Sequence, residues 1–367
     1  MARGRPLLLP ALAVLGLALA ACSESPPAPE PNPEAGATAP AVKVAAKPDR
    51  PDRAVHGASV PRGNAVRRWR EPLHKAAATG RLDAVAAQLD AGISVDALAA
   101  GHTAPLHAAS FGGHLEVVAL LLERGADIDA LDAVRATPLL LAAGHGHLAV
   151  VERLLAGGAR LDVADEHGTT ALHAATMNDD RAVATALIEA GADVNARTRR
   201  HYSPIQLAAR NGSIELIELL AARGGDLAAR RPNGFTALHD ALQHRQADTL
   251  KWLLAHGSDP NDPISGGSRP LHVAVQTDVP ELVALLVEGG ADVDAANARG
   301  TTPLHMAAWS CKLDALRALL AHGARTDLTD GKGNTALMLA SMPGESKTRK
   351  QLRLEAKQIL EAHAAGG

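Results

Sequence analysis

The sequence predicts an all-α solenoid of about nine helix-turn-helix units, and three observations lead to that fold class. A motif returns every 33 residues, which is the signature of a repeat architecture. Each unit carries two short apolar segments at helical spacing, separated by turn residues. The chain is 47% hydrophobic but only 2% aromatic, so its core is expected to consist of Leu, Ala and Val. One apolar residue marks the same phase of every unit: Leu73, Leu106, Leu139, Leu172, Ile205, Leu238, Leu271, Leu304 and Leu337.

Residues 1–21 have the features of an export signal. Arg3 and Arg5 precede a short apolar run that is too short for a membrane span. The run ends in "LAAC", which resembles the lipobox of bacterial lipoproteins. That resemblance implies cleavage before Cys22 and lipidation of Cys22, and Ser23 favours the outer membrane over retention at the inner one. The alternative is an ordinary signal peptide cleaved near Ala21, with Cys22 left as an idle thiol.

Residues 22–68 are predicted to be a disordered tether rich in Pro and Ala. Stretches such as "SPPAPEPNPE" have almost no large apolar residues, so they cannot bury enough surface to offset chain entropy. Proline favours an extended geometry, which would let the segment span a distance from a membrane. A segment that is merely tolerated, with no role as a spacer, is the alternative.

Residues 69–367 are predicted to form the repeat domain, and each unit has its own start and stop signals. The first helix is expected to begin after a side chain that can cap its free amides. The second helix is expected to end at a glycine that adopts a left-handed conformation. The predicted capping residues are Thr137, Thr170, Ser203, Thr236, Thr302 and Thr335, and the glycines are Gly92, Gly125, Gly158, Gly191, Gly224, Gly257, Gly290 and Gly323.

These units resemble those of the ankyrin-repeat family. Examples are "APLHAASFGGHLEVVALLLERGADIDA" and "RPLHVAVQTDVPELVALLVEGGADVDA", and the resemblance extends over about four fifths of the chain. It implies an ankyrin-repeat solenoid with short β-hairpin fingers, and a concave surface of fingertips and first helices that binds partner proteins. It also implies that the His after the phase Leu hydrogen-bonds the Thr hydroxyl and nearby backbone.

Several function classes are not favoured by the sequence. A formal charge of -3 gives no basic footprint for nucleic acid. His145, His147 and His244 have no carboxylate or thiol at ligand spacing, so no metal is expected. Hydrolase and phosphate-binding motifs are absent from the sequence, and therefore we expect neither enzymatic activity nor a cofactor.

Candidate partner-binding residues are those that depart from the repeat pattern. Phe111, Met177, Arg210 and Trp309 lie five residues after the phase residue of their units, on the exposed side of the first helix. Large apolar side chains at that place are candidate anchors. Packing of each against an adjoining finger is the alternative.

A basic and aromatic cluster is predicted at two neighbouring fingertips. Its aromatic members are Tyr202 and Phe235, and it indicates an acidic protein partner. A solvated charged face is the alternative. The arginines around the two rings are Arg197, Arg199, Arg200, Arg230 and Arg231, and of these Arg199, Arg200 and Arg231 are taken as partner-binding residues.

The last unit is predicted to cap the array. An insertion of about seven residues moves its second helix to roughly 350–363, where Lys350, Arg353 and Glu355 are expected on a polar outer side that faces water.

The sequence therefore predicts a monomeric, non-enzymatic protein-binding module, lipid-anchored in the bacterial cell envelope on the periplasmic side of the outer membrane. Two alternatives belong to other classes. One is an immunity or inhibitor protein that occludes a toxin or an envelope enzyme, and the other is a metal-binding or hydrolytic stress protein.

Overall fold

The computed structural model describes residues 72–342 and 347–366, which lie in one structural unit of the chain. The described residues form eighteen α-helices, and the only β-type pairing among them is an isolated bridge between Ala99 and Thr103. The all-α prediction is confirmed, whereas the fingers consist of turns rather than strands. The predicted signal peptide, Cys22 and the predicted tether lie outside the described residues.

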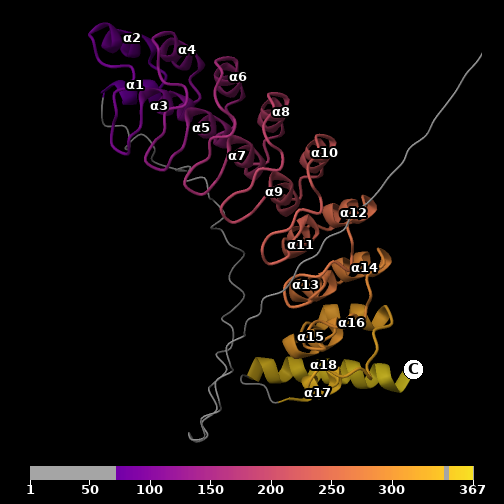
Figure 1. The fold of residues 1–367 in the computed structure, drawn as a ribbon. Coiled ribbons are helices and arrows are strands. Elements are labelled where there is room, and N and C mark those ends of the chain that lie inside the picture. Colours follow the sequence, from indigo (N-terminus) through magenta and orange to yellow (C-terminus); the bar gives the residue numbers. More distant parts are fainter. Residues whose placement is uncertain (1–71, 343–346, 367) are drawn as a thin grey trace, which may run out of the picture. The chain divides into compact units, whose positions relative to one another are not determined.

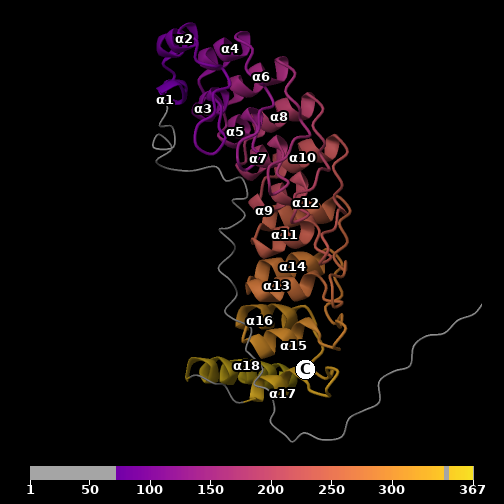
Figure 2. The ribbon, with the colours of Figure 1, turned by 60° about the vertical axis from the view of Figure 1, so that its left-hand side comes forward.

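The helices form two rows, as Figures 1 and 2 show, and each unit contributes one helix to each row. The first helices are α1 (Pro72–Ala78), α3 (Pro105–Gly112), α5 (Pro138–Gly144), α7 (Ala171–Met177), α9 (Pro204–Asn211), α11 (Ala237–Gln243), α13 (Pro270–Thr277), α15 (Pro303–Ser310) and α17 (Ala336–Ser341). The second helices are α2 (Leu82–Asp90), α4 (Leu115–Glu123), α6 (Leu148–Ala156), α8 (Arg181–Glu189), α10 (Ile214–Ala222), α12 (Ala247–Ala255), α14 (Pro280–Glu288), α16 (Leu313–Ala321) and α18 (Lys347–Gly366).

The predicted start and stop signals lie at the ends of the helices. All six predicted Thr and Ser residues are the N-caps of their helices. In four of the six, including Thr137 and Thr335, the hydroxyl oxygen accepts a hydrogen bond from a backbone amide in the first turn. The eight glycines after the second helices have φ between 83° and 94°. A Cβ would meet no atom within 4 Å at any of them, so the preference for Gly is conformational, not steric.

The core is continuous along the array. The first eight phase residues are each at most 2% exposed, because the next unit covers them. Leu337, the ninth, is only half-buried, since among the described residues no later first helix packs against α17. Alanine pairs such as Ala108 and Ala109 are completely buried and let the first helices of neighbouring units approach closely. Each unit therefore depends on its neighbours for burial.

Histidines that follow the phase residue join one unit to the next. The ring Nε2 of His74, for example, lies 2.9 Å from the carbonyl oxygen of Thr103 in the following finger. His107, His173, His272 and His305 make the same contact with the carbonyl 29 residues ahead. The Nδ1 of His173 lies 2.9 Å from the hydroxyl of Thr170. The expected structural role of these histidines is confirmed.

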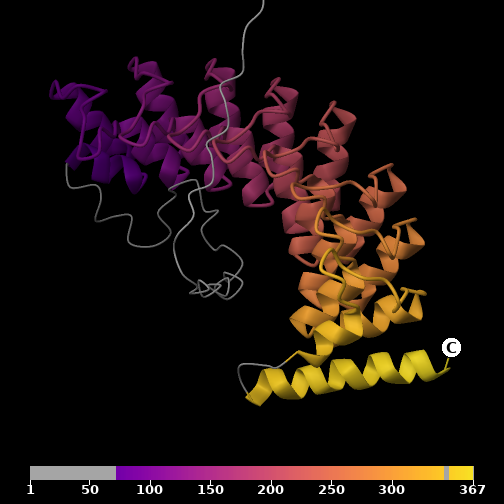
Figure 3. The same cartoon turned by 60° about the horizontal axis from the view of Figure 1, so that its bottom comes forward.

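The terminal helix α18 differs from the expected cap in length and in one side chain. It runs over residues 347–366 instead of 350–363 and is the long helix at one end of the array in Figure 3. Arg353 does not face water as expected, because its side chain is turned toward the array. The residue is only 5% exposed, and its Nη1 donates 2.7 Å to the carbonyl oxygen of Met342.

We expect His173→Gln to reduce the loss of stability in acid. Burial lowers the pKa of His173 from 6.5 to about 4, so the folded state binds this proton less readily than the unfolded state. The contribution of the neutral ring to stability is complete above pH 6.5 and is lost as the pH falls toward 4, by on the order of 3 kcal/mol.

Gln206 shows that an amide fits this position, since its Nε2 donates to the carbonyl oxygens of Ala229 and Phe235, the same two contacts that His173 makes. The measurement is urea unfolding of wild type and variant between neutral pH and about pH 4. Equal losses in both proteins would contradict the assignment.

Candidate partner-binding site

The predicted partner-binding residues lie on two fingers and near the ends of four first helices. Arg199, Arg200 and Tyr202 are on the finger between α8 and α9, and Arg231 and Phe235 are on the finger between α10 and α11. Phe111, Met177, Arg210 and Trp309 belong to α3, α7, α9 and α15. The structure brings Tyr202, Arg231 and Phe235 into direct contact, whereas Phe111 and Trp309 belong to other parts of the array.

Neighbouring fingers are joined by single backbone hydrogen bonds, which we call rungs. In each rung an amide donates to a carbonyl oxygen of the preceding finger over 2.8–3.0 Å. Six rungs occur among the described residues, and their donors follow the 33-residue period except for one double interval. The donors are Ala133, Glu166, Arg199, Ser265, Ala298 and Gly331.

The missing rung falls at Pro232. Proline has no amide hydrogen, so residue 232 cannot donate to the carbonyl oxygen of Arg200 on the preceding finger. Side chains join these two fingers instead. Arg197 donates from Nη1 to the carbonyl oxygen of Arg230 over 2.9 Å, and Arg231 donates from Nη1 to the hydroxyl of Tyr202 over 2.8 Å.

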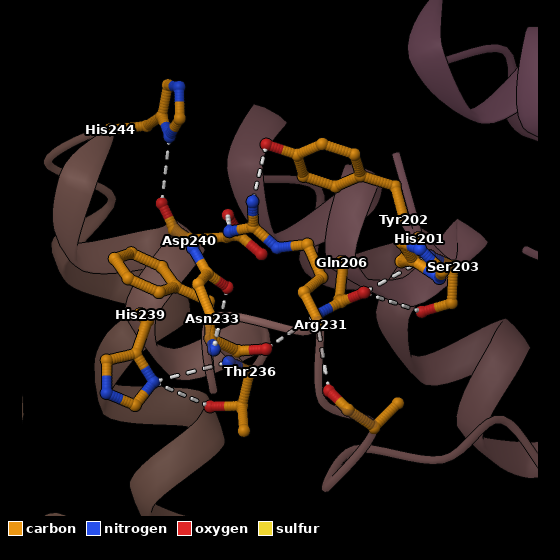
Figure 4. Close-up of polar contacts among 12 residues, drawn as sticks. His201, Tyr202, Ser203, Gln206, Arg231, Asn233, Thr236, His239, Asp240 and His244 are labelled. Atoms are coloured by element: carbon orange, nitrogen blue, oxygen red, sulfur yellow. Dashed lines mark hydrogen bonds and ion pairs between the residues drawn. The ribbon is translucent and has the colours of Figure 1, made fainter. Parts of the chain in front are cut away.

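Arg231 is the centre of the contact between the two fingers, as Figure 4 shows. Its guanidinium lies 4.2 Å from the ring centroid of Tyr202 and 4.9 Å from that of Phe235, which are cation-π distances. Its Nη2 forms an ion pair of 2.5 Å with Asp240 on α11. The side chain of Asp240 is 0% exposed and that of Arg231 is 10% exposed, so this pair is shielded from water.

Burial also shifts the ionisation of the cluster. It raises the pKa of Asp240 to about 7, although the positive charges of Arg231 and Arg210 oppose the shift. Burial lowers the pKa of His239 to about 4, and the nearby charges of Arg230 and Arg231 lower it further. Three buried atoms have no hydrogen-bond partner among the described residues: Nε of Arg231, Oδ2 of Asp240 and Nε2 of His239. The contacts of Arg231 and Asp240 therefore offset the cost of burying these polar groups only in part.

The other fingertip arginines divide into two kinds. Arg197 and Arg230 bind other residues of the array. Arg197 donates to the carbonyl oxygen of Arg230, and Arg230 forms an ion pair with Asp262 of the following finger. Arg199 and Arg200 are exposed, and neither forms an ion pair with a residue that the structure describes. The sequence contains no Asp or Glu between residues 194 and 214, so nothing nearby in the chain neutralises them. The predicted basic cluster thus leaves two side chains available to a partner.

Phe111 and Trp309 stand in different surroundings. Phe111 is half-buried against Ala136, Leu140 and Leu141, and its ring lies 4.2 Å from that of His145, which favours the packing alternative. Trp309 is 46% exposed, and the guanidinium of Arg353 lies 4.7 Å from its ring. Met177 is half-buried at the end of α7. Of the three apolar candidates, Trp309 has the exposure that an anchor needs.

Metal-ligand groups and membrane-spanning helices are both absent from the described part of the chain. It contains no group of three or more His, Cys, Asp or Glu side chains that could hold a metal ion. Over the same residues, no helix combines the length and the apolar character required to cross a bilayer.

Comparison with known proteins agrees with the helical repeat. The family profile described as "Ankyrin repeats (3 copies)" matches residues 54–132, 130–198, 195–264 and 271–360. The chain belongs to the ankyrin-repeat family. It is similar to the solved ankyrin repeat domain of Bcl-3, described as a unique member of the IkappaB protein family, with 31% identity and a TM-score of 0.53. The match covers 62% of this chain and 98% of the Bcl-3 chain. No curated protein matches the sequence.

Asp240 is the residue of this ankyrin-repeat site that the sequence analysis missed. Its position in the repeat could have revealed it, because the residue two positions after the phase Leu or Ile is apolar in seven of the nine units. Those residues are Ala108, Leu141, Ala174, Leu207, Val273, Met306 and Leu339. Arg231 departs from its own row, in which Asp132, Thr198 and Asn297 accept backbone amides of their own fingers. Two departures from the repeat therefore pair with each other.

We expect Asp240→Ala to destabilise the domain and the double variant Asp240→Ala with Arg231→Thr to restore most of the loss. Alone, the first change leaves a shielded guanidinium without its counter-ion. The cost should be roughly 3 kcal/mol, the lower end for a broken buried pair, since Arg231 can turn toward water. Ala174 and Thr198 show that both new residues fit their rows.

The measurement is the free energy of unfolding of the wild type, both single variants and the double variant in a double-mutant cycle. Additive losses would mean that Arg231 and Asp240 are not coupled.

Proposed function

We propose that this chain is a lipid-anchored ankyrin-repeat module of the bacterial cell envelope that binds a protein partner carrying acidic groups. Ankyrin repeats indicate a protein-protein interaction module, and the family match covers most of the chain. The acidic partner, the membrane anchor and the periplasmic outer-membrane location are our extension of that general role.

The observation that carries the proposal is the pair of unpaired arginines beside a rigid aromatic contact. Arg199 and Arg200 are exposed on a finger whose Tyr202 is fixed by Arg231. A guanidinium can pair with a carboxylate through two hydrogen bonds, which gives direction as well as attraction. Because the fingers are already ordered by rungs and side-chain contacts, binding would order few groups and lose little entropy.

Support for the anchor comes from the sequence. "LAAC" at residues 19–22 has the lipobox pattern and follows an apolar run of suitable length. Several acyl chains would hold the protein durably, since each buried methylene contributes about 0.8 kcal/mol and a single chain is marginal.

We expect Cys22→Ala to move the protein from the membrane fraction to the soluble fraction of a bacterial host, because the variant cannot be acylated at that position. The measurement is fractionation followed by immunoblotting, with metabolic labelling by a palmitate analogue. Cys311→Ala is the matched control, since Cys311 is the other cysteine of the chain and is buried within the repeats. Retention of the Cys22→Ala protein at the membrane would contradict the proposed anchor.

We expect Trp309→Ala combined with Arg199→Gln and Arg200→Gln to reduce capture of envelope proteins by the purified repeat domain. These three side chains are exposed, so a partner can contact them, and their loss should weaken binding. Because they contribute little to the core, the variant should still fold. The measurement is quantitative mass spectrometry of cross-linked proteins, compared with wild type. Arg160→Gln with Arg325→Gln is the control, because these exposed finger arginines pair with Asp162 and Asp327. Equal capture by the triple variant and wild type would count against this face.

A further inference from the structure

The missing rung leaves one backbone acceptor at the middle of the finger row. At six other places the amide of the following finger takes up this carbonyl position, but Pro232 cannot. No described residue donates to the carbonyl oxygen of Arg200, and Arg200 itself is exposed. A backbone acceptor that belongs to an exposed residue and continues a series of formed rungs is a position at which an extended chain can donate an amide.

We propose that this open rung is the docking point for an extended acidic segment of the protein partner. An amide of that segment donates to the carbonyl oxygen of Arg200, and its carboxylates pair with the guanidinium groups of Arg199 and Arg200. The inference rests on the proposed function and deepens it, because it assigns the acidic partner to one place on the fingers and to one backbone conformation.

Charge argues for an acidic segment rather than a neutral or basic one. Residues 194–214 contain four arginines and no acid, although the whole chain has a net charge of -3. On the following finger, Arg230 and Arg231 are neutralised by Asp262 and Asp240, so the unpaired positive charge is that of Arg199 and Arg200. The positive charge is therefore local, and a short segment is a better fit to it than a long polyanion such as a nucleic acid.

Rigidity at the same place argues for docking rather than for a merely loose joint. The finger with Arg199 and Arg200 is joined to the preceding finger by the rung from Arg199 to the carbonyl oxygen of His167, at 2.8 Å. On the other side, Arg231 holds Tyr202 by a hydrogen bond and a cation-π contact. The acceptor is thus fixed from both sides while its own amide partner is missing.

The decisive variant is Pro232→Ala, which supplies the absent amide hydrogen. It is expected to close the rung with the carbonyl oxygen of Arg200 and so to compete with the incoming segment. The exposed position of Pro232 makes the change compatible with the fold. Because the substitution leaves every charge in place, it separates a backbone contact from simple electrostatic attraction.

The test uses the full chain lacking the signal peptide and a fluorescently labelled octaglutamate peptide, with binding followed by fluorescence anisotropy at low salt. We expect Arg199→Gln with Arg200→Gln to weaken binding by about tenfold or more, the effect of losing charge-assisted hydrogen bonds. We expect Pro232→Ala to weaken binding by about threefold or more, as one neutral hydrogen bond would. Arg160→Gln with Arg325→Gln should bind as wild type does.

Four outcomes would overturn the inference. Octaglutamate could fail to bind to wild type, or the Arg199 and Arg200 double variant could bind equally well. Pro232→Ala could leave the affinity for octaglutamate unchanged. A thymidine oligonucleotide of equal length could also bind as tightly and be unaffected by Pro232→Ala, which would indicate general attraction of anions. Capture of a protein partner that needs Trp309 but not Arg199 or Arg200 would keep the proposed function and reject this docking point.

Discussion

No unit of this chain holds a core of its own, and this constraint governs the remaining structure. A helix pair such as α7 and α8 buries Leu172 and Leu187 only because α5 and α9 lie on either side of α7, with α6 and α10 beside α8. Leu337 shows the same dependence, because it is only half-buried on α17, against which no later first helix packs among the described residues. Burial between neighbours requires that each unit present the same face at the same spacing, which explains why the period never slips.

That constraint also explains which features the sequence could predict. The caps, the left-handed glycines and the phase leucines serve local geometry and burial between neighbours, so they repeat and can be recognised from one chain. The grouping of Tyr202 and Phe235 at one place was anticipated in part, because both rings are rare residues on adjacent fingers. Arg231 joins the two rings, although the sequence marked it as a partner-binding residue and not as a contact within the array.

The features that were not predicted are contacts between residues that each depart from the repeat pattern. Asp240 is visible as an acid in a mostly apolar row, and Arg231 as a cation in a row that consists mostly of amide acceptors. The period does not say whether two such exceptions contact each other. Arg353 escaped for another reason. The insertion before α18 changes where that helix lies, so a side chain expected in water reaches the carbonyl oxygen of Met342 and stacks on Trp309. The repeat pattern predicts the features that all units share, and it does not predict the contacts of an element such as α18 that departs from the pattern.

The exceptions at the middle of the array form a connected set. Pro232 removes a backbone bond between two fingers, and Arg231, its neighbour in the chain, replaces that bond with a side-chain bond to Tyr202. Asp240 then supplies the counter-charge that keeps Arg231 in place. A buried ion pair is weak support for stability, because the desolvation of both charges offsets their attraction. Apolar residues occupy the same position as Asp240 in most other units and pack well there. The pair is therefore better explained by the position it gives to Tyr202, Arg231 and the open carbonyl oxygen of Arg200 than by any gain in folding free energy.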